Sequence, residues 1–256
     1  MFAKNLILIF VVMVALGIAF AAKPIAQDPS YHLFADQRTI LGVANGCNVM
    51  SNLLFVISGT WGLVFLLHLW RHGARGVLML EYGMFFAGIV LIGIGSAGYH
   101  LHPANASLAW DRLPMTIAFM SLLCSVISES IDRKAGLFLL VPLLVAGGLS
   151  VVYWAWTEQR GQGDLRAYIV VQFLPLVLIP LILLLYKTPG TYRTYLWLLV
   201  MVYGFSKMLE HFDKAIYSFG AIVSGHTLKH VLAALGTALV LKMLSTRKNE
   251  LVLLRE

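Results

Sequence analysis

The chain has 256 residues, of which 59% are hydrophobic and only 12% are charged, and its mean hydropathy is +0.82. Soluble domains carry about 25% charged residues, so this composition excludes an ordinary soluble protein and places the chain in a bilayer. The net charge of +7 could suggest a nucleic-acid partner, but the Lys and Arg residues lie singly or in pairs between apolar runs. Membrane-flanking charges are distributed in that way, and we expect no nucleic-acid partner.

The first apolar run extends from Leu6 to Ala22 and follows a single Lys4. It ends in Ala19, Phe20 and Ala21, the small-residue pattern that signal peptidases cleave. Residues 1–22 are therefore either a signal peptide or an extra N-terminal transmembrane helix, and both interpretations stay open. Residues 23–256 are predicted to form one membrane domain.

Seven further apolar runs follow the polar stretch 23–45, each near the 20 residues that a helix needs to cross a membrane. The fold class predicted is all-α, a multi-pass bundle of seven transmembrane helices preceded by the N-terminal hydrophobic segment. The second span contains Gly93 and Ala97 at a spacing that lets helices approach closely, so we expect it to lie centrally. The predicted spans are residues 46–70, 82–101, 113–130, 136–156, 167–186, 194–212 and 219–242.

Positive charge is biased toward one side of the membrane, with ten Lys and Arg residues in alternate loops against six in the others. The richer side is expected to be cytoplasmic, which places the C-terminus in the cytoplasm and the start of the first of the seven spans outside. The ten residues are Arg71, Arg75, Arg133, Lys134, Lys187, Arg193, Lys242, Arg247, Lys248 and Arg255.

Three histidines indicate a metal site on the outer side. His226 and His230 are four residues apart, so they share one face of the last span. An isolated pair would be explained more simply as two hydrogen-bonded histidines, but His100 ends the second span on the same predicted side. Three histidines leave a fourth tetrahedral position for water and lower the pKa of that water to about 7. We therefore predict a catalytic zinc site.

Two further polar residues accompany the histidines. Asp111 is predicted to open the third span, where a carboxylate near a helix N-terminus is favoured. It could cap the helix or pair with Arg112, or it could act as general base and then general acid. Ser96 precedes His100 by four residues, so it could stabilise an oxyanion or orient the water. Its hydroxyl could equally bond back to its own helix.

Other histidines and charged residues compete for these roles. His68 and His72 repeat the four-residue spacing, but they flank Arg71 at the predicted cytoplasmic end and have no third ligand beside them. Competitors on the outer side are His32, His102 and His211. A further polar group could line a pocket mouth or simply be solvated at the end of the sixth span: Lys207, Glu210, His211 and Asp213.

Three stretches carry a resemblance to a known family. They are Gly95–His100 continuing to Trp110–Met115, then His226-Thr227-Leu228-Lys229-His230, and a weaker match at Asn48–Asn52. There the sequence resembles the alkaline ceramidases, within the seven-helix zinc hydrolase superfamily that also includes the progestin and adipoQ type receptors. The resemblance extends over roughly residues 32–242 and leaves out the N-terminal segment.

The resemblance implies zinc bound by His100, His226 and His230, with Asp111 transferring protons and Ser96 assisting the oxyanion. The reaction it implies is hydrolysis of the amide bond of ceramide, a membrane lipid, to a fatty acid and a sphingoid base. The alternative within the same superfamily is a non-enzymatic, lipid-binding receptor in which zinc is structural.

The sequence departs from the family in two places. Arg112 stands where the familiar eukaryotic members carry an acidic residue, and the acidic calcium-binding cluster before the first span is thin. Asp36, Asn45 and Asn48 could still supply oxygen ligands to calcium, whereas the nearby Arg38 could replace a cation with its own charge. Calcium is therefore left out of the predicted site.

Overall fold

The computed structural model describes residues 2–249, so Arg255 of the charge count and the other end residues of the chain lie outside the described part. Within that part the regular structure is helical, apart from an isolated bridge between Ile40 and Val43. This confirms the all-α class. The elements are α1 (Phe2–Ala21), the short 3-10 helix η1 (Pro29–His32), α2 (Gly46–Ser51), α3 (Leu53–Arg71), α4 (Val77–Leu101), α5 (Asn105–Ser130), α6 (Arg133–Gln159), α7 (Arg166–Leu185), α8 (Gly190–His211), α9 (Asp213–Ser218) and α10 (Gly225–Thr246).

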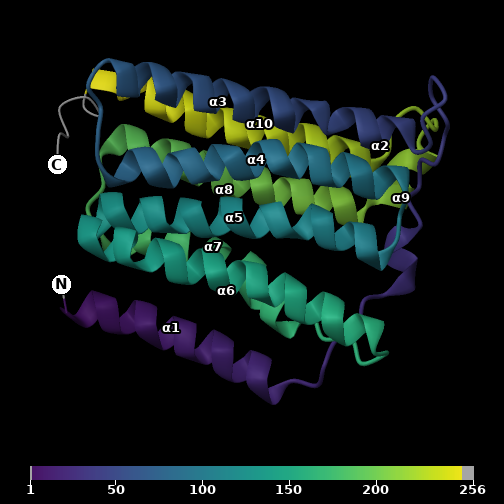
Figure 1. Cartoon of the computed structure of the whole chain (residues 1–256), viewed down its shortest axis with the longest axis horizontal. Coiled ribbons are helices and arrows are strands. Elements are labelled where there is room, and N and C mark those ends of the chain that lie inside the picture. The colour runs from purple at the N-terminus through teal and green to yellow at the C-terminus, as the bar shows by residue number, and fades with distance from the viewer. Residues whose placement is uncertain (1, 250–256) are drawn as a thin grey trace.

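Seven helical segments among residues 2–249 are long and apolar enough to cross a membrane, namely α1, the α2–α3 segment, α4, α5, α6, α7 and α10. The chain is therefore a multi-pass membrane protein. Helix α8, also predicted as a span, has 22 residues but is too polar for that criterion because tyrosines, threonines and charged residues lower its hydropathy. It nevertheless runs alongside the other long helices and packs against α10 (Figure 1).

The long helices lie side by side, with α1 at one edge against α7 and with α3 and α10 at the opposite edge (Figure 1). Helix α4 contacts α2, α3, α5 and α6, as its glycines predicted. A Cβ at Gly93 would lie 2.9 Å from the carbonyl oxygen of Asn52, and one at Gly88 would lie 2.9 Å from the amide nitrogen of Ala118. Glycine at these positions therefore lets α3 and α5 approach α4 closely.

Helix α1 is attached to α7 by polar contacts at both of its ends. The Arg166 guanidinium donates to the carbonyl oxygens of Ala19 and Ala22, and the Tyr186 hydroxyl donates to the Asn5 side chain at the other end. Asp164 holds the guanidinium of Arg166 through an ion pair of 2.7 Å, which lowers the pKa of Asp164 to about 2. In this structure α1 forms an additional helix of the bundle.

Two predicted helix starts differ from the structure by more than five residues. The last span was expected from residue 219, but α10 begins at Gly225 because Gly220 and Ala221 adopt positive φ and break the helix, and the Ser224 side chain caps the new start by accepting from the Thr227 amide. The third span was expected from residue 113, but α5 begins at Asn105. Asp111 therefore lies nearly two turns inside α5, so the helix-terminus explanation for its position is wrong.

The start of α5 is set by local residues that the hydropathy pattern did not register. Pro103 follows the last residues of α4, and the Ser107 hydroxyl accepts a hydrogen bond from the Ala104 amide at 3.1 Å. Such a side-chain acceptor satisfies one of the amide groups left free where a helix begins. The end of the bundle where α4 ends and α10 begins is called the histidine end below, and the other is called the opposite end.

Candidate metal centre

His100, near the end of α4, and His226 and His230, in the first turns of α10, come together at the histidine end. Their residues are only 1%, 5% and 4% exposed, and one nitrogen of each lies within 4.8 Å of the others. Among residues 2–249 this is the only group of three or more His, Cys, Asp or Glu side chains placed closely enough to share a metal ion. The structure thus brings the three predicted ligands together.

The spacing of the triad fits a metal ion. The Nε2 atoms of His100 and His226 are 3.3 Å apart, and the three rings form a triangle with all centroid separations 4.9 Å. Two nitrogens bound at about 2.05 Å with tetrahedral angles lie about 3.3 Å apart. Imidazole donors suit zinc and several other first-row metals, so the donor set fits a metal without naming it.

Ser51 orients one ring of the triad. Its Oγ lies 2.9 Å from His230 Nδ1 and donates its own proton to the Asn48 carbonyl oxygen at 2.9 Å. The Ser51 oxygen must therefore accept from a protonated Nδ1, which leaves the Nε2 lone pair of His230 for a metal. Metal-binding histidines are regularly held in this way by a hydrogen bond from the second ring nitrogen.

The backbone of the site is fixed by carboxylate and amide side chains. Asp213 accepts from the His226 amide at 2.7 Å and from the Ala35 amide at 2.9 Å, so it joins the start of α10 to the N-terminal loop. Asn45 donates to the His100 carbonyl oxygen at 2.8 Å.

Phe34 of the N-terminal loop lies over the triad, with its ring centroid 4.5 Å from that of His100 and 4.9 Å from that of His226. The loop therefore covers the site.

Ser96 and Asp111 face each other between α4 and α5, close enough for the Ser96 hydroxyl to interact with the Asp111 carboxylate. Their proximity depends on Gly95, because a Cβ there would lie 2.2 Å from the Trp110 carbonyl oxygen. Both side chains line the same cavity as His230. Ser96 therefore lies across the α4–α5 contact from Asp111, at the edge of the cavity.

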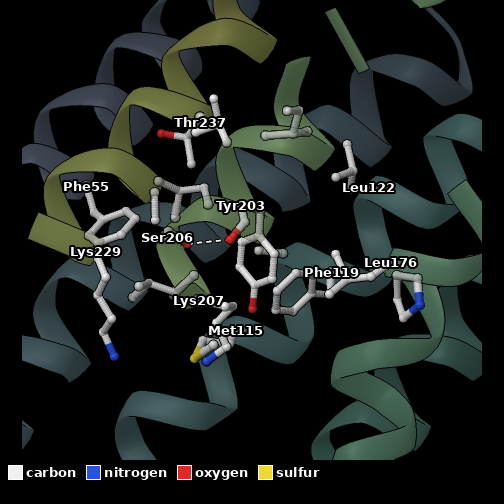
Figure 2. Close-up of a pocket in the computed structure, with 18 of the residues that line it drawn as sticks. Phe55, Met115, Phe119, Leu122, Leu176, Tyr203, Ser206, Lys207, Lys229 and Thr237 are labelled. Atoms are coloured by element: carbon white, nitrogen blue, oxygen red, sulfur yellow. Dashed lines mark hydrogen bonds between the residues drawn. The ribbon is translucent and has the colours of Figure 1, made fainter. Parts of the chain in front are cut away.

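That cavity is mostly apolar and runs between α3, α4, α5, α7, α8 and α10. Lys207, Lys229 and Met115 lie toward one end, and Leu122 and Thr237 lie toward the other (Figure 2). Asp111 and Leu122 are eleven positions apart in α5, which corresponds to about 16 Å along a helix. The reactive groups therefore border a deep apolar space inside the bundle.

The competing histidines form hydrogen bonds with other groups or are exposed. Both ring nitrogens of His32 are engaged at 2.9 Å, one by the Tyr99 hydroxyl and one by the Asn105 side chain. His68 and His72 lie at the opposite end, where a ring nitrogen of His72 bonds to the His68 carbonyl oxygen. The remaining competitors, His102 and His211, are exposed.

The residues considered for calcium are engaged with protein groups. Arg38 binds Asp36 through two hydrogen bonds of 2.8 and 2.7 Å and also donates to the Ile222 carbonyl oxygen at 2.7 Å. The guanidinium holds the pKa of Asp36 below its ordinary value. Asn48 donates to the Asp36 carbonyl oxygen at 3.3 Å and accepts from the Thr227 hydroxyl at 2.8 Å. Arg38 thus occupies the carboxylate that a cation would need.

Arg112 points away from Asp111 rather than pairing with it. Its guanidinium donates to the Gln27 side chain at 2.6 Å and lies over the rings of Trp154 and Tyr168, 4.3 and 4.8 Å from their centroids. Cation–π contacts of this kind stabilise a buried guanidinium. The direct contacts of the Arg112 guanidinium are therefore with Gln27 and aromatic rings.

Sequence reasoning missed Lys229 and left Glu210 and Lys207 without a role. Glu210 accepts from the ammonium groups of both lysines, and both lysines line the apolar cavity. A charged residue between two predicted ligands on an apolar span was the available signal, because ionisable groups inside spans usually face a functional interior.

The comparisons with known proteins leave the family prediction as it stood. No model of a known protein family matches the sequence, and no curated protein matches it.

Proposed function

We propose that this chain is a zinc-dependent hydrolase of the amide bond of ceramide-like membrane lipids. The observation that supports this most strongly is the junction of a buried three-histidine site with an apolar cavity at Ser96 and Asp111. Such a cavity suits a lipid chain, and a metal that only stabilised the bundle would need no carboxylate beside it. The resemblance of the motifs at these residues to alkaline ceramidases supplies the amide substrate.

His100, His226 and His230 would hold the zinc ion, which supplies Lewis-acid activation of a water molecule and of the substrate carbonyl. Asp111 accepts one proton from the attacking water as general base and then delivers it to the amide nitrogen as general acid. The carbon–oxygen bond forms, the carbon–nitrogen bond breaks, and the products are a fatty acid and a sphingoid base. Ser96, a residue only 3% exposed and directed at Asp111, orients that carboxylate before the attack. Its single hydroxyl proton becomes available to the oxyanion once Asp111 has accepted the proton of the water.

The charge bias of the loops supports an orientation in which the histidine end faces the periplasmic, extracellular or lumenal side. The starts of α1 and α4 and the end of α10 would then lie on the cytoplasmic side. A substrate would reach the cavity from the outer leaflet.

The test is metal analysis of the purified protein followed by incubation with a panel of ceramides and detection of released sphingoid base. About one zinc per chain with release of base is the expected result. Zinc without release from any ceramide would favour the receptor alternative, and a protein without zinc would contradict both.

A further inference from the structure

The metal centre separates two cavities of different character. His230 lines the apolar cavity inside the bundle, whereas His226 lines a more polar cavity at the histidine end, which is bordered by the N-terminal loop, the end of α8 and α9. Lys207 lines both cavities. A lipid whose chain fills the apolar cavity and whose carbonyl lies at the metal centre would therefore extend its amine portion toward Lys207.

Two ammonium groups and one carboxylate meet at this passage. Glu210 accepts from Lys207 through one oxygen and from Lys229 through the other. The three side chains are 33%, 18% and 15% exposed for Lys207, Lys229 and Glu210. Each ammonium carries three donors, and the contact with Glu210 uses one, so both lysines retain donors for a ligand. The Tyr31 hydroxyl also donates to Glu210, at 3.4 Å.

The charges at this passage favour an anion when a metal is bound. Lys229 also interacts electrostatically with the Asp111 carboxylate. Lys207 and Lys229 are then balanced by Glu210 and Asp111, so the four side chains sum to zero. A divalent cation held by three neutral imidazoles would make the region positive, and a negatively charged group on the ligand would be attracted to the side where Lys207 stands.

We propose that the preferred substrates are amide lipids whose amine portion carries an anionic group close to the scissile bond, such as N-acyl amino acids or lipids with a phosphorylated head group. Lys207, with support from Lys229, binds that anion. This inference rests on the proposed amide hydrolysis for its substrate class, but its binding step is measured separately from turnover. A purely structural clamp between α8 and α10 would bind charged and neutral lipids equally.

The experiment compares matched lipids that differ in charge. Binding of N-oleoylglycine and N-oleoylethanolamine is measured on the zinc-loaded, full-length protein carrying Asp111→Asn, so that turnover does not interfere. Because this substitution removes one negative charge from the cavity, only the part of the preference that disappears in Lys207→Met is assigned to Lys207. Ceramide 1-phosphate and ceramide form a second pair that separates phosphate from carboxylate recognition. A charge-assisted hydrogen bond predicts at least one anionic lipid bound about tenfold more tightly than its neutral partner.

Lys207→Met in the same background is expected to remove most of that preference by weakening only the anionic lipid. Lys187→Met is the matched control, because Lys187 is exposed at the opposite end. Its loss should change only the general attraction of anions to the detergent-solubilised protein. Equal binding within both pairs, or a preference unchanged in Lys207→Met, would overturn the inference, and the first criterion does not depend on whether Lys207→Met folds. Absence of hydrolysis by the wild type would instead contradict the proposed function, with the binding ratio still deciding this inference.

Discussion

The two ends of the bundle both bury ionisable groups, but they use them differently. At the opposite end the Arg247 guanidinium pairs with Glu129 at 2.7 Å, and Glu129 also accepts from the Tyr82 hydroxyl at 2.6 Å. At the histidine end three histidine rings direct nitrogens at one another, and one of them, His230, borders a cavity. The first arrangement pairs opposite charges within the protein. The second presents nitrogen lone pairs that only an added cation could bind together. Burial of ionisable groups alone therefore does not identify a functional site.

The largest expected effect separates two histidine pairs with the same spacing. His226→Ala should lose zinc almost completely, because two histidines and no carboxylate ligand remain in the triad. His72→Ala, at the opposite end, should retain about one zinc per chain. Elemental analysis of both purified variants measures the zinc content. Equal zinc contents in the two variants would contradict the assignment of His226 as a metal ligand.

The next effect concerns turnover without metal loss. Asp111→Asn should lower the rate of ceramide hydrolysis by about 100-fold or more, since a positioned general acid–base contributes 10²–10⁴-fold, while zinc content stays unchanged. Asp132→Asn is the control, because Asp132 caps α6 by accepting from the Ala135 amide and asparagine caps equally well. A wild-type rate in Asp111→Asn would show that this carboxylate does not transfer protons.

The opposite end should respond in stability rather than in metal content. Glu129→Gln removes one carboxylate that pairs with the buried Arg247 guanidinium, and loss of one partner of a buried ion pair costs about 3 kcal/mol. Thermal unfolding of the purified variant should show a clearly lower midpoint, with zinc per chain as in the wild type. Loss of zinc at an unchanged midpoint would mean that the two ends are coupled in a way that the present account does not contain.

The smallest predicted effect tests the close approach of α4 and α5. Gly95→Ala places a Cβ against the Trp110 carbonyl oxygen, and overpacking of that kind costs about 1–3 kcal/mol. It should also reduce hydrolysis, because Ser96 and Asp111 are moved apart. Gly98→Ala on the same helix meets nothing within 4 Å and should leave both stability and rate near those of the wild type. Matching behaviour of the two variants would contradict the proposed role of this contact.

Much of the fold followed from hydropathy, because a spanning helix is a local property of about 20 residues. The side-of-membrane argument also grouped His100 with His226 and His230 and set His68 and His72 apart, and the structure places the residues in that way. Neither prediction required knowledge of how any helix is rotated about its own axis.

What the sequence did not predict depends on contacts between helices. The start of α5 was missed because Ser107 caps a polar turn that carries no apolar signal. The pairing of Ser51 with His230, and of Lys229 with Glu210, depends on which faces α2, α8 and α10 turn toward each other. Such rotations are fixed by close packing at glycines and by polar contacts that are far apart in the chain, so spacing within one helix could not predict them.

The central claim is tested most directly by measuring amide hydrolysis against zinc content. The purified protein is stripped of metal with a chelator and reloaded with increasing zinc, and the rate of sphingoid base release from ceramide is followed at each step. We predict that the rate falls to background on stripping and rises in proportion to zinc up to one ion per chain. Release that persists in the stripped protein, or a fully loaded protein that releases no base, would contradict the account.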